Sequence, residues 1–266
     1  ETAHTSDDNR VAVDAVLPFQ IEEQQAGTQL SNWVSSRWFA PGDFKQKGAR
    51  GKFSGVYLPF WTYDAMTFSR YHGQRGDNYH ETERYTDSEG KTRTRQVTKT
   101  RWRFVSGHVQ RFFDDILVCA TDGVPHKIVN RLEPWHLERC HPFTRQALAG
   151  FQARTYDIEL GDGFEIARDR MDNQISSDVR RDIGGDHQRV HSIDTRYDAL
   201  SYKQLLLPLW LLSYRYKETI YRVVVNAQTG EVQGERPYSW IKIILAVIIA
   251  ASLVLAVSLG VYAFGG

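Results

Sequence analysis

The stretch GVYLPFWTYDAMTFSRY, residues 55–71, decides the class of fold that this sequence predicts. It is rich in aromatic and branched apolar residues, which are favoured in β-strands. Apolar side chains fall on both faces of the predicted strand, as in a strand that is buried on both sides. We therefore interpret its aromatic residues as part of a core, and not as a platform on which nucleic-acid bases stack.

The segments on either side of this strand predict more strands and two helices. Apolar residues at three-to-four spacing predict helices over residues 22–38 and 164–183, and Gly184 and Gly185 stop the second one. Further strands and hairpins are expected over residues 79–86 with 92–104, 109–120, 191–197, and 205–216 with 220–225. The predicted fold class is therefore α+β, with mostly antiparallel sheets and a few packing helices.

Charge and cysteine content narrow the function classes. The chain has 33 Lys and Arg against 32 Asp and Glu, a formal charge of +1, so no global field attracts it to nucleic acid or anionic lipid. Its two cysteines, Cys119 and Cys140, are too few for a four-cysteine zinc site within this chain, and they fit a reducing compartment. Any charged partner must therefore meet a local patch.

The C-terminal residues predict a transmembrane helix over residues 243–264, which carry no charged side chain and are long enough to cross a bilayer. Basic residues precede this stretch and only glycine follows it, which favours a cytoplasmic position for the large domain at a bacterial inner membrane. Membrane lipid is then an expected partner. The predicted anchor flanks are Arg236, Tyr238, Trp240 and Lys242.

These elements predict a domain organisation in three parts. Residues 1–10 are expected to be a disordered start or linker. Residues 11–236 are expected to form the soluble α+β domain, either as one domain or as two subdomains with a boundary near 125–160. Residues 237–266 are expected to form an interfacial flank and the transmembrane helix.

One basic stripe stands out, because all its members have odd numbers and would share one face of a strand about 40 Å long. It could bind lipid, a protein or the phosphates of nucleic acid. The alternative is a solvated hairpin in which Glu81 and Glu83 pair with the stripe. The residues of this basic stripe are Lys91, Arg93, Arg95, Lys99, Arg101 and Arg103.

Asp186, His187 and His191 form the one candidate metal cluster, because two histidines four residues apart share a helix face. The glycines before them should end the helix, however, and on a strand the two histidines stand about 13 Å apart. A polar turn followed by a strand is the alternative. Asp114 and Asp115 are adjacent, so on a strand they point to opposite faces and are expected at the surface.

Several long motifs of this sequence resemble a family of uncharacterised bacterial membrane proteins, which often carry the label primosomal protein N-prime (replication factor Y)-like or zinc-ribbon protein. Members of that family usually carry four-cysteine zinc ribbons, so the resemblance implies either a zinc ribbon ahead of residue 1 or a member without one. No cofactor is expected within this chain. The helicase-like label lacks support, since the sequence has no GxxxxGK[ST] loop. The matching stretches are SRWFAP (36–41), GVYLPFWTYDA (55–65), YHGQRGDNY (71–79), RFFDDILV (111–118), RDIGGDHQRVHS (181–192) and VVNAQTGEVQGERPYSW (224–240).

These observations lead to three functional hypotheses. The first is a membrane-anchored, non-enzymatic scaffold or accessory subunit that binds a protein partner or self-assembles into a homo-oligomer. The second is a membrane-tethered nucleic-acid-binding module that uses the basic stripe of residues 91–103. The third is a metal-dependent hydrolase at His187 and His191. No catalytic residue and no small-molecule substrate is predicted.

Overall fold

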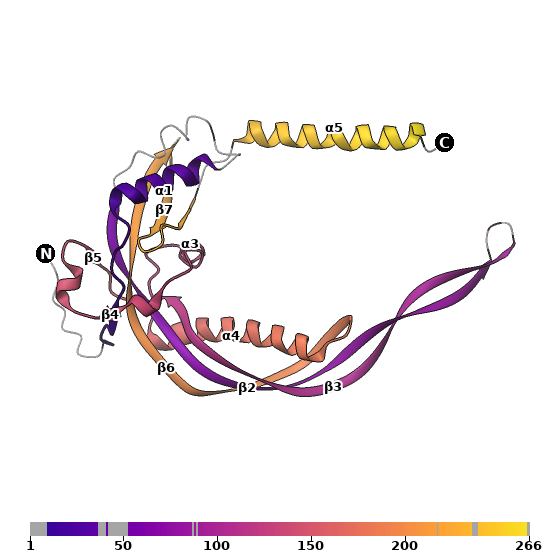
Figure 1. Ribbon diagram of the computed structural model, residues 1–266, viewed down its shortest axis with the longest axis horizontal. Helices are drawn as coiled ribbons and strands as arrows, with labels where there is room; N and C mark the ends of the chain where they lie inside the picture. The colour runs from indigo at the N-terminus through magenta and orange to yellow at the C-terminus, as the bar shows by residue number, and fades with distance from the viewer. Residues whose placement is uncertain are drawn as a thin grey trace. The chain divides into compact units, whose positions relative to one another are not determined.

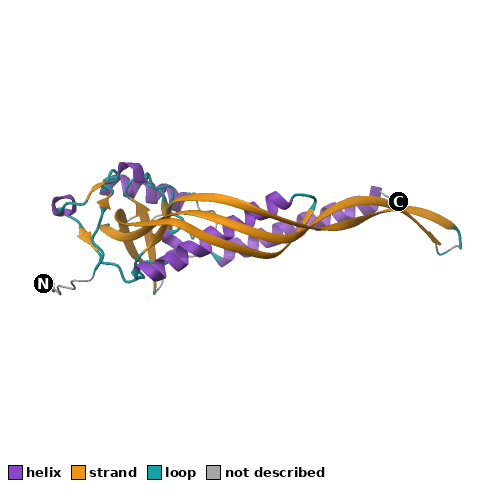
Figure 2. Ribbon diagram, turned by 90° about the horizontal axis from the view of Figure 1, so that it is seen from below, coloured by secondary structure: helices purple, strands orange, loops and turns teal. Residues whose placement is uncertain are grey.

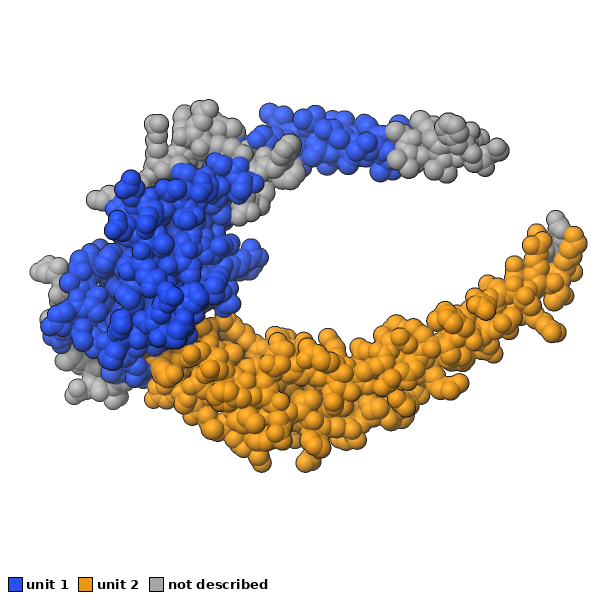
Figure 3. Space-filling view, in the orientation of Figure 1, with its two compact units in different colours: residues 1–60, 119–157, 205–266 blue, residues 61–118, 158–204 orange. Residues whose placement is uncertain are grey.

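The structure is a computed structural model that describes residues 10–36, 41, 53–86, 88, 90–216, 218–235 and 239–264, with the backbone alone at 214–216 and 256–264. It divides into two compact units, which are described separately below (Figure 3). Unit 1 comprises residues 1–60, 119–157 and 205–266, and unit 2 comprises residues 61–118 and 158–204. Each unit is assembled from separate segments of the chain, because long strands pass from one unit into the other.

The strands belong to one mixed sheet, in which the order β3-β2-β6-β1-β4 is joined by β5 beside β2, β7 beside β6 and β8 beside β7 (Figures 1 and 2). The short strands β1 and β5 pair in parallel with β6 and β2, whereas β7 pairs antiparallel with β6 and β8. The strands are β1 Ala15–Val16, β2 Ser54–Thr86, β3 Thr92–Cys119, β4 His141–Pro142, β5 Gln152–Ala153, β6 His187–Tyr216, β7 Thr219–Asn226 and β8 Val232–Gly234.

The prediction of an α+β fold with mostly antiparallel sheets is therefore wrong, because the strands form one large mixed sheet. The parallel partners β1 and β5 are two residues long, and so short a segment has no periodicity that a sequence could reveal. The polar residues 71–79 do not interrupt the strand pattern either, and β2 continues through them. Gly73 permits this course, because a Cβ atom there would lie 2.5 Å from the backbone oxygen of Arg189 on β6.

In unit 2, the helix α4, Leu160–Ile183, covers one face of the β3-β2-β6 sheet (Figure 1). Its buried seam at three-to-four spacing confirms the helix that the sequence predicted over residues 164–183. The odd-numbered side chains of β2 from Trp61 to Tyr71 are buried beneath it. The seam consists of Gly163, Ala167, Met171, Ile175, Val179 and Ile183.

Hydrogen bonds from β2 fix both ends of α4. At its start, Trp61 Nε1 donates to the carbonyl of Ile158 at 2.9 Å and Tyr63 Oη donates to that of Leu160 at 2.7 Å. At its end, Tyr71 Oη donates to Asp182 Oδ2 at 2.6 Å. These bonds satisfy polar atoms of a buried aromatic face and set the position of the helix along the strand.

In unit 1, the helix α1, Glu23–Ser35, packs through Ala26, Leu30 and Val34 against a core that includes Trp210. This confirms the predicted helix over residues 22–38 as far as Ser35. A turn after Asn226 joins β7 to β8, and Gly230 has a φ of 80° there. The remaining short helices are α3 His126–Val129 and the 3-10 turns Leu137–Arg139 and Arg145–Leu148.

The C-terminal helix α5, Trp240–Phe264, requires a correction of the membrane prediction. Within the described residues, no helix has the length and apolar character needed to cross a membrane. The predicted transmembrane span, and the single-pass anchor built on it, are therefore overturned. Trp240 and Lys242 lie in the first turn of α5, while Arg236 and Tyr238 fall outside the described residues.

Candidate functional site

The basic stripe lies along the hairpin of β2 and β3, where its central members contact acidic side chains. Lys99 Nζ lies 2.9 Å from a carboxylate oxygen of Glu81 and 2.9 Å from one of Glu83. Hydrogen bonds to Glu81 and Glu83 raise the pKa of Lys99. Arg95 lies 3.4 Å from Glu83, and Arg103 lies 3.8 Å from an Asp77 oxygen. These cations therefore already have carboxylate partners across the hairpin.

Two arginines of the stripe also lie over aromatic rings. The guanidinium of Arg101 is 5.1 Å from the ring centre of Tyr79, and that of Arg95 is 5.6 Å from the ring centre of Tyr85. Such cation–π contacts cover aromatic faces that could otherwise stack on nucleic-acid bases. Lys91 and Arg93 lie at the entrance to β3.

The predicted metal cluster at Asp186, His187 and His191 is spread over different neighbours. The helix α4 ends at Ile183, as predicted, and both histidines lie on strand β6. Asp186 Oδ2 accepts a hydrogen bond from the backbone of Asn78 at 2.7 Å. The ring of His187 lies 6.3 Å from Trp102, whereas the ring of His191 lies 6.4 Å from Phe104.

The face of the unit 2 sheet opposite α4, which we call the open face, carries large exposed side chains. Among the described elements of unit 2, no helix runs along this face (Figure 1). Phe104 is 81% exposed and Phe112 is 59% exposed, although both belong to a long central portion of β3. Between positions 104 and 114 of β3, every even-numbered residue is exposed: Phe104, Ser106, His108, Gln110, Phe112 and Asp114.

A hollow of about 480 Å³ crosses the open face and takes lining residues from all three strands. The guanidinium of Arg196 lies 5.1 Å from the ring centre of Phe68 within it. Arg196 also lies 2.8 Å from Asp198. The hollow thus combines an aromatic floor with basic side chains. Its lining includes Phe68, Arg70, His108, Gln110, Asp194 and Arg196.

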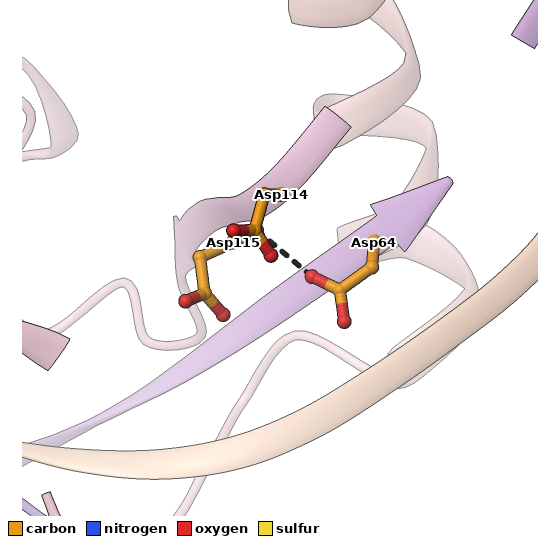
Figure 4. Close-up of side chains that lie close together, drawn as sticks. All are labelled: Asp64, Asp114 and Asp115. Atoms are coloured by element: carbon orange, nitrogen blue, oxygen red, sulfur yellow. Dashed lines mark hydrogen bonds between the residues drawn. The ribbon is translucent and has the colours of Figure 1, made fainter. Parts of the chain in front are cut away.

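Close to one end of the open face, Asp64, Asp114 and Asp115 form an acidic pocket (Figure 4). One carboxylate oxygen from each lies within 4.8 Å of the others. The backbone nitrogen of Asp115 donates to Asp64 Oδ1 at 2.8 Å, and Ser201 Oγ donates to Asp64 Oδ2 at 2.9 Å. Asp64, on the central strand β2, therefore contacts both neighbouring strands.

A left-handed backbone explains why the two adjacent aspartates converge. Asp115 has a φ of 52°, which interrupts the regular alternation of β3 as a β-bulge does. Ala199 on β6 has a φ of 51°, so the strand on the other side of Asp64 is also irregular. The prediction that Asp114 and Asp115 point to opposite faces is therefore wrong.

The electrostatics of the acidic pocket are only partly balanced. Lys203 Nζ lies 3.9 Å from Asp64 Oδ2 and 3.8 Å from Asp115 Oδ1. Burial raises the pKa of Asp115, and the charges of Asp64 and Asp114 raise it further, against the lowering effects of Lys203 and Thr62. Thr62 Oγ1 faces the Asp115 carboxyl, yet it is fully buried and makes no hydrogen bond of normal geometry.

The sequence contained a signal for this pocket that our interpretation missed. Asp64 is the one charged residue between positions 56 and 69, in a strand predicted to be buried on both faces. A lone carboxylate in such a strand needs a polar or ionic partner, because burial disfavours an unpaired charge.

Comparison with known proteins gives one distant relative. No family model matches the chain. It is 25% identical over 231 residues to the uncharacterised protein YdjG of Bacillus subtilis (strain 168). The aligned region covers 84% of this chain and 63% of that protein, so the chain spans less than two thirds of its relative. No solved structure matches. The resemblance to zinc-ribbon proteins stays a prediction.

Proposed function

We propose that this chain is a non-enzymatic binding protein, whose unit 2 holds a protein partner on the open face. The observation that carries the proposal is the exposure of Phe104 and Phe112 on a sheet whose opposite face is covered by α4. Exposed apolar side chains grouped on one face are typical of protein interaction sites. The scaffold hypothesis is thereby kept without the membrane anchor.

The chemistry of the open face indicates what kind of partner it would bind. Burying each phenylalanine would contribute roughly 1.5–3 kcal/mol, which makes them candidate anchors of an interface. Arg70 and His108 line the hollow between them. A segment with apolar side chains and interspersed carboxylates would complement both features.

The nucleic-acid alternative has less support from the contacts of the basic stripe. A phosphate that approached Lys99 would have to displace Glu81 and Glu83, each of which lies 2.9 Å from its ammonium group. Basic side chains that bind DNA phosphates release the counterions of the DNA, and this release contributes much of the binding free energy. A lysine or arginine that is already paired with a carboxylate contributes less, because the carboxylate must first be displaced.

Site-specific photocrosslinking in cells that express the full chain tests the proposal. A benzophenone amino acid at position 104, and separately at 112, is expected to give one discrete crosslinked protein of the same mass. The matched control is position 168 on α4, where the Arg168 side chain is 43% exposed but belongs to the opposite side of the sheet. Phe104→Ser should then abolish the crosslink formed from position 112.

Two results would contradict the proposal. One is an equal crosslinking pattern from positions 104, 112 and 168, which would indicate random collisions. The other is a crosslink from 112 that persists unchanged in the Phe104→Ser variant, because a single docked partner should need both anchors.

A further inference from the structure

The acidic pocket holds more negative charge than its surroundings balance. Asp64, Asp114 and Asp115 bring one carboxylate oxygen each within 4.8 Å of the others. The only cation that the described contacts place beside them is Lys203, at 3.8 and 3.9 Å. Three carboxylates and one ammonium group leave a formal charge of −2. Like charges this close repel each other unless a cation of higher charge neutralises them.

A second and independent feature is the buried hydroxyl of Thr62. Its Oγ1 atom is fully buried and forms no hydrogen bond of normal geometry, although it faces the Asp115 carboxyl. Thr62 and Asp64 are two residues apart on β2, so their side chains share one face of the sheet. Buried polar atoms without a partner are rare in proteins and are commonly explained by an ion or a water.

We propose that Asp64, Asp114, Asp115 and Thr62 bind a calcium ion. All four offer oxygen atoms, which hard cations such as Ca²⁺ and Mg²⁺ prefer. Ligands on opposite sides of Ca²⁺ stand about 4.8 Å apart, whereas around Mg²⁺ they stand about 4.2 Å apart. The three oxygens lie within 4.8 Å of one another, so all can reach one Ca²⁺. Three carboxylates also favour calcium, because Mg²⁺ is usually held by one or two carboxylates together with substrate phosphates. This calcium site is separate from the proposed binding of a protein partner, and it can be tested without any partner.

Lys203 has a defined role in this proposal. Its ammonium group lies close to Asp64 and Asp115 and competes with the ion for the same oxygens. Calcium binding displaces it. Removing the lysine charge therefore strengthens binding, which a general loss of structure would not do.

The test is isothermal titration of calcium chloride into the full chain after treatment with a chelator. Wild type is expected to bind one ion, with a melting temperature that rises as calcium is added. Asp64→Asn removes a charged ligand and should weaken calcium binding at least about 30-fold, whereas Thr62→Val removes a neutral ligand and should weaken it about threefold. Lys203→Met removes the competing charge and should tighten calcium binding about tenfold. Asp194→Asn, on the same open face but outside the pocket, is the matched control and should bind like wild type.

Three outcomes would overturn the proposal. The first is no heat and no rise in melting temperature at millimolar calcium. The second is equal affinity of wild type and the Lys203→Met variant. The third is tighter binding of Mg²⁺ than of Ca²⁺, which would remove the assignment of calcium. Because Lys203→Met is expected to gain affinity, a folding defect in Asp64→Asn leaves the test decisive.

Discussion

The two faces of the unit 2 sheet use the same strands for opposite purposes. Beneath α4, Trp61 and Tyr63 of β2 are buried and hydrogen bonded to the helix backbone. On the open face, Phe104 and Phe112 of β3 are exposed, and the half-buried Asp64 belongs to an acidic pocket. The comparison shows that burial and side-chain hydrogen bonding to α4 are found on the covered face, whereas large apolar side chains of the open face stay exposed.

The largest expected effect comes from the covered face. Trp61→Ala removes a fully buried side chain and should lower the free energy of unfolding by about 3–5 kcal/mol. Phe112→Ala, on the open face, should change it by less than about 0.5 kcal/mol. Urea unfolding followed by circular dichroism measures both. Equal losses in the two variants would show that the open face is as important for stability as the covered one.

A smaller loss is expected at the ion pair that joins β3 to α4. Arg111 donates to both carboxylate oxygens of Asp178, at 2.5 and 2.9 Å, and the Asp178 side chain is only 13% exposed. Asp178→Asn should lower the free energy of unfolding by about 1–2 kcal/mol. The loss is substantial because the bidentate contact is charged, and it is limited because the Arg111 side chain is partly solvated. The same urea measurement applies, and a cost below that of Lys99→Gln in the exposed hairpin would refute this ranking.

One carboxylate on each side of the sheet, Asp178 and Asp115, should make folding stability depend on pH in opposite directions. The hydrogen bond from Arg111 lowers the pKa of Asp178. Its stabilising contribution is therefore complete above the unfolded-state pKa of about 3.9 and is lost as the pH falls below it. Burial raises the pKa of Asp115, so ionising this group costs stability as the pH rises above about 3.9.

Two variants separate these contributions in the presence of a chelator. Asp178→Asn should remove part of the loss of stability in acid, whereas Asp115→Asn should raise the free energy of unfolding near neutral pH and leave it little changed near pH 3. Unfolding curves between about pH 3 and pH 8 measure both. A neutral-pH loss in Asp115→Asn would mean that its contact with Lys203 outweighs the cost of burial.

The smallest effect is expected in the hairpin. Replacing Glu81 and Glu83 together by Gln removes both carboxylate partners of Lys99. These are exposed ion pairs, so the free energy of unfolding should change by less than about 0.5 kcal/mol. Thermal melts at low and high salt measure the effect. A loss near that of Asp178→Asn would show that the hairpin is held by its charges.

Sequence periodicity was sufficient to predict the elements of the covered face, but it was not sufficient to predict the acidic pocket. The three-to-four spacing of residues 164–183 and the aromatic strand of residues 55–71 identified α4 and the central part of β2. The pocket depends on the left-handed backbone at Asp115, which is not a glycine and so gives no local signal. It also depends on strand pairing between residues distant in sequence, such as Asp64 and Ser201.

The membrane prediction and the mixed sheet show two other limits of sequence reasoning. An apolar composition over residues 243–264 predicted a helix correctly, since α5 forms there, but composition alone did not decide whether it spans a membrane. Parallel pairing by strands of two residues is set by tertiary contacts, and no local pattern encodes it.

The hydrogen bonds at both ends of α4 limit how the lengths of these elements can change in related sequences. Tyr63 and Tyr71 of β2 bind the helix at Leu160 and Asp182, so an insertion of one residue between the tyrosines would turn every following side chain to the other face. The hairpin residues beyond Tyr79 contact one another in strand-to-strand pairs, such as Thr98 with His80. Relatives should therefore vary in the length of the hairpin, in steps of one residue per strand, and keep the segment between the two tyrosines constant.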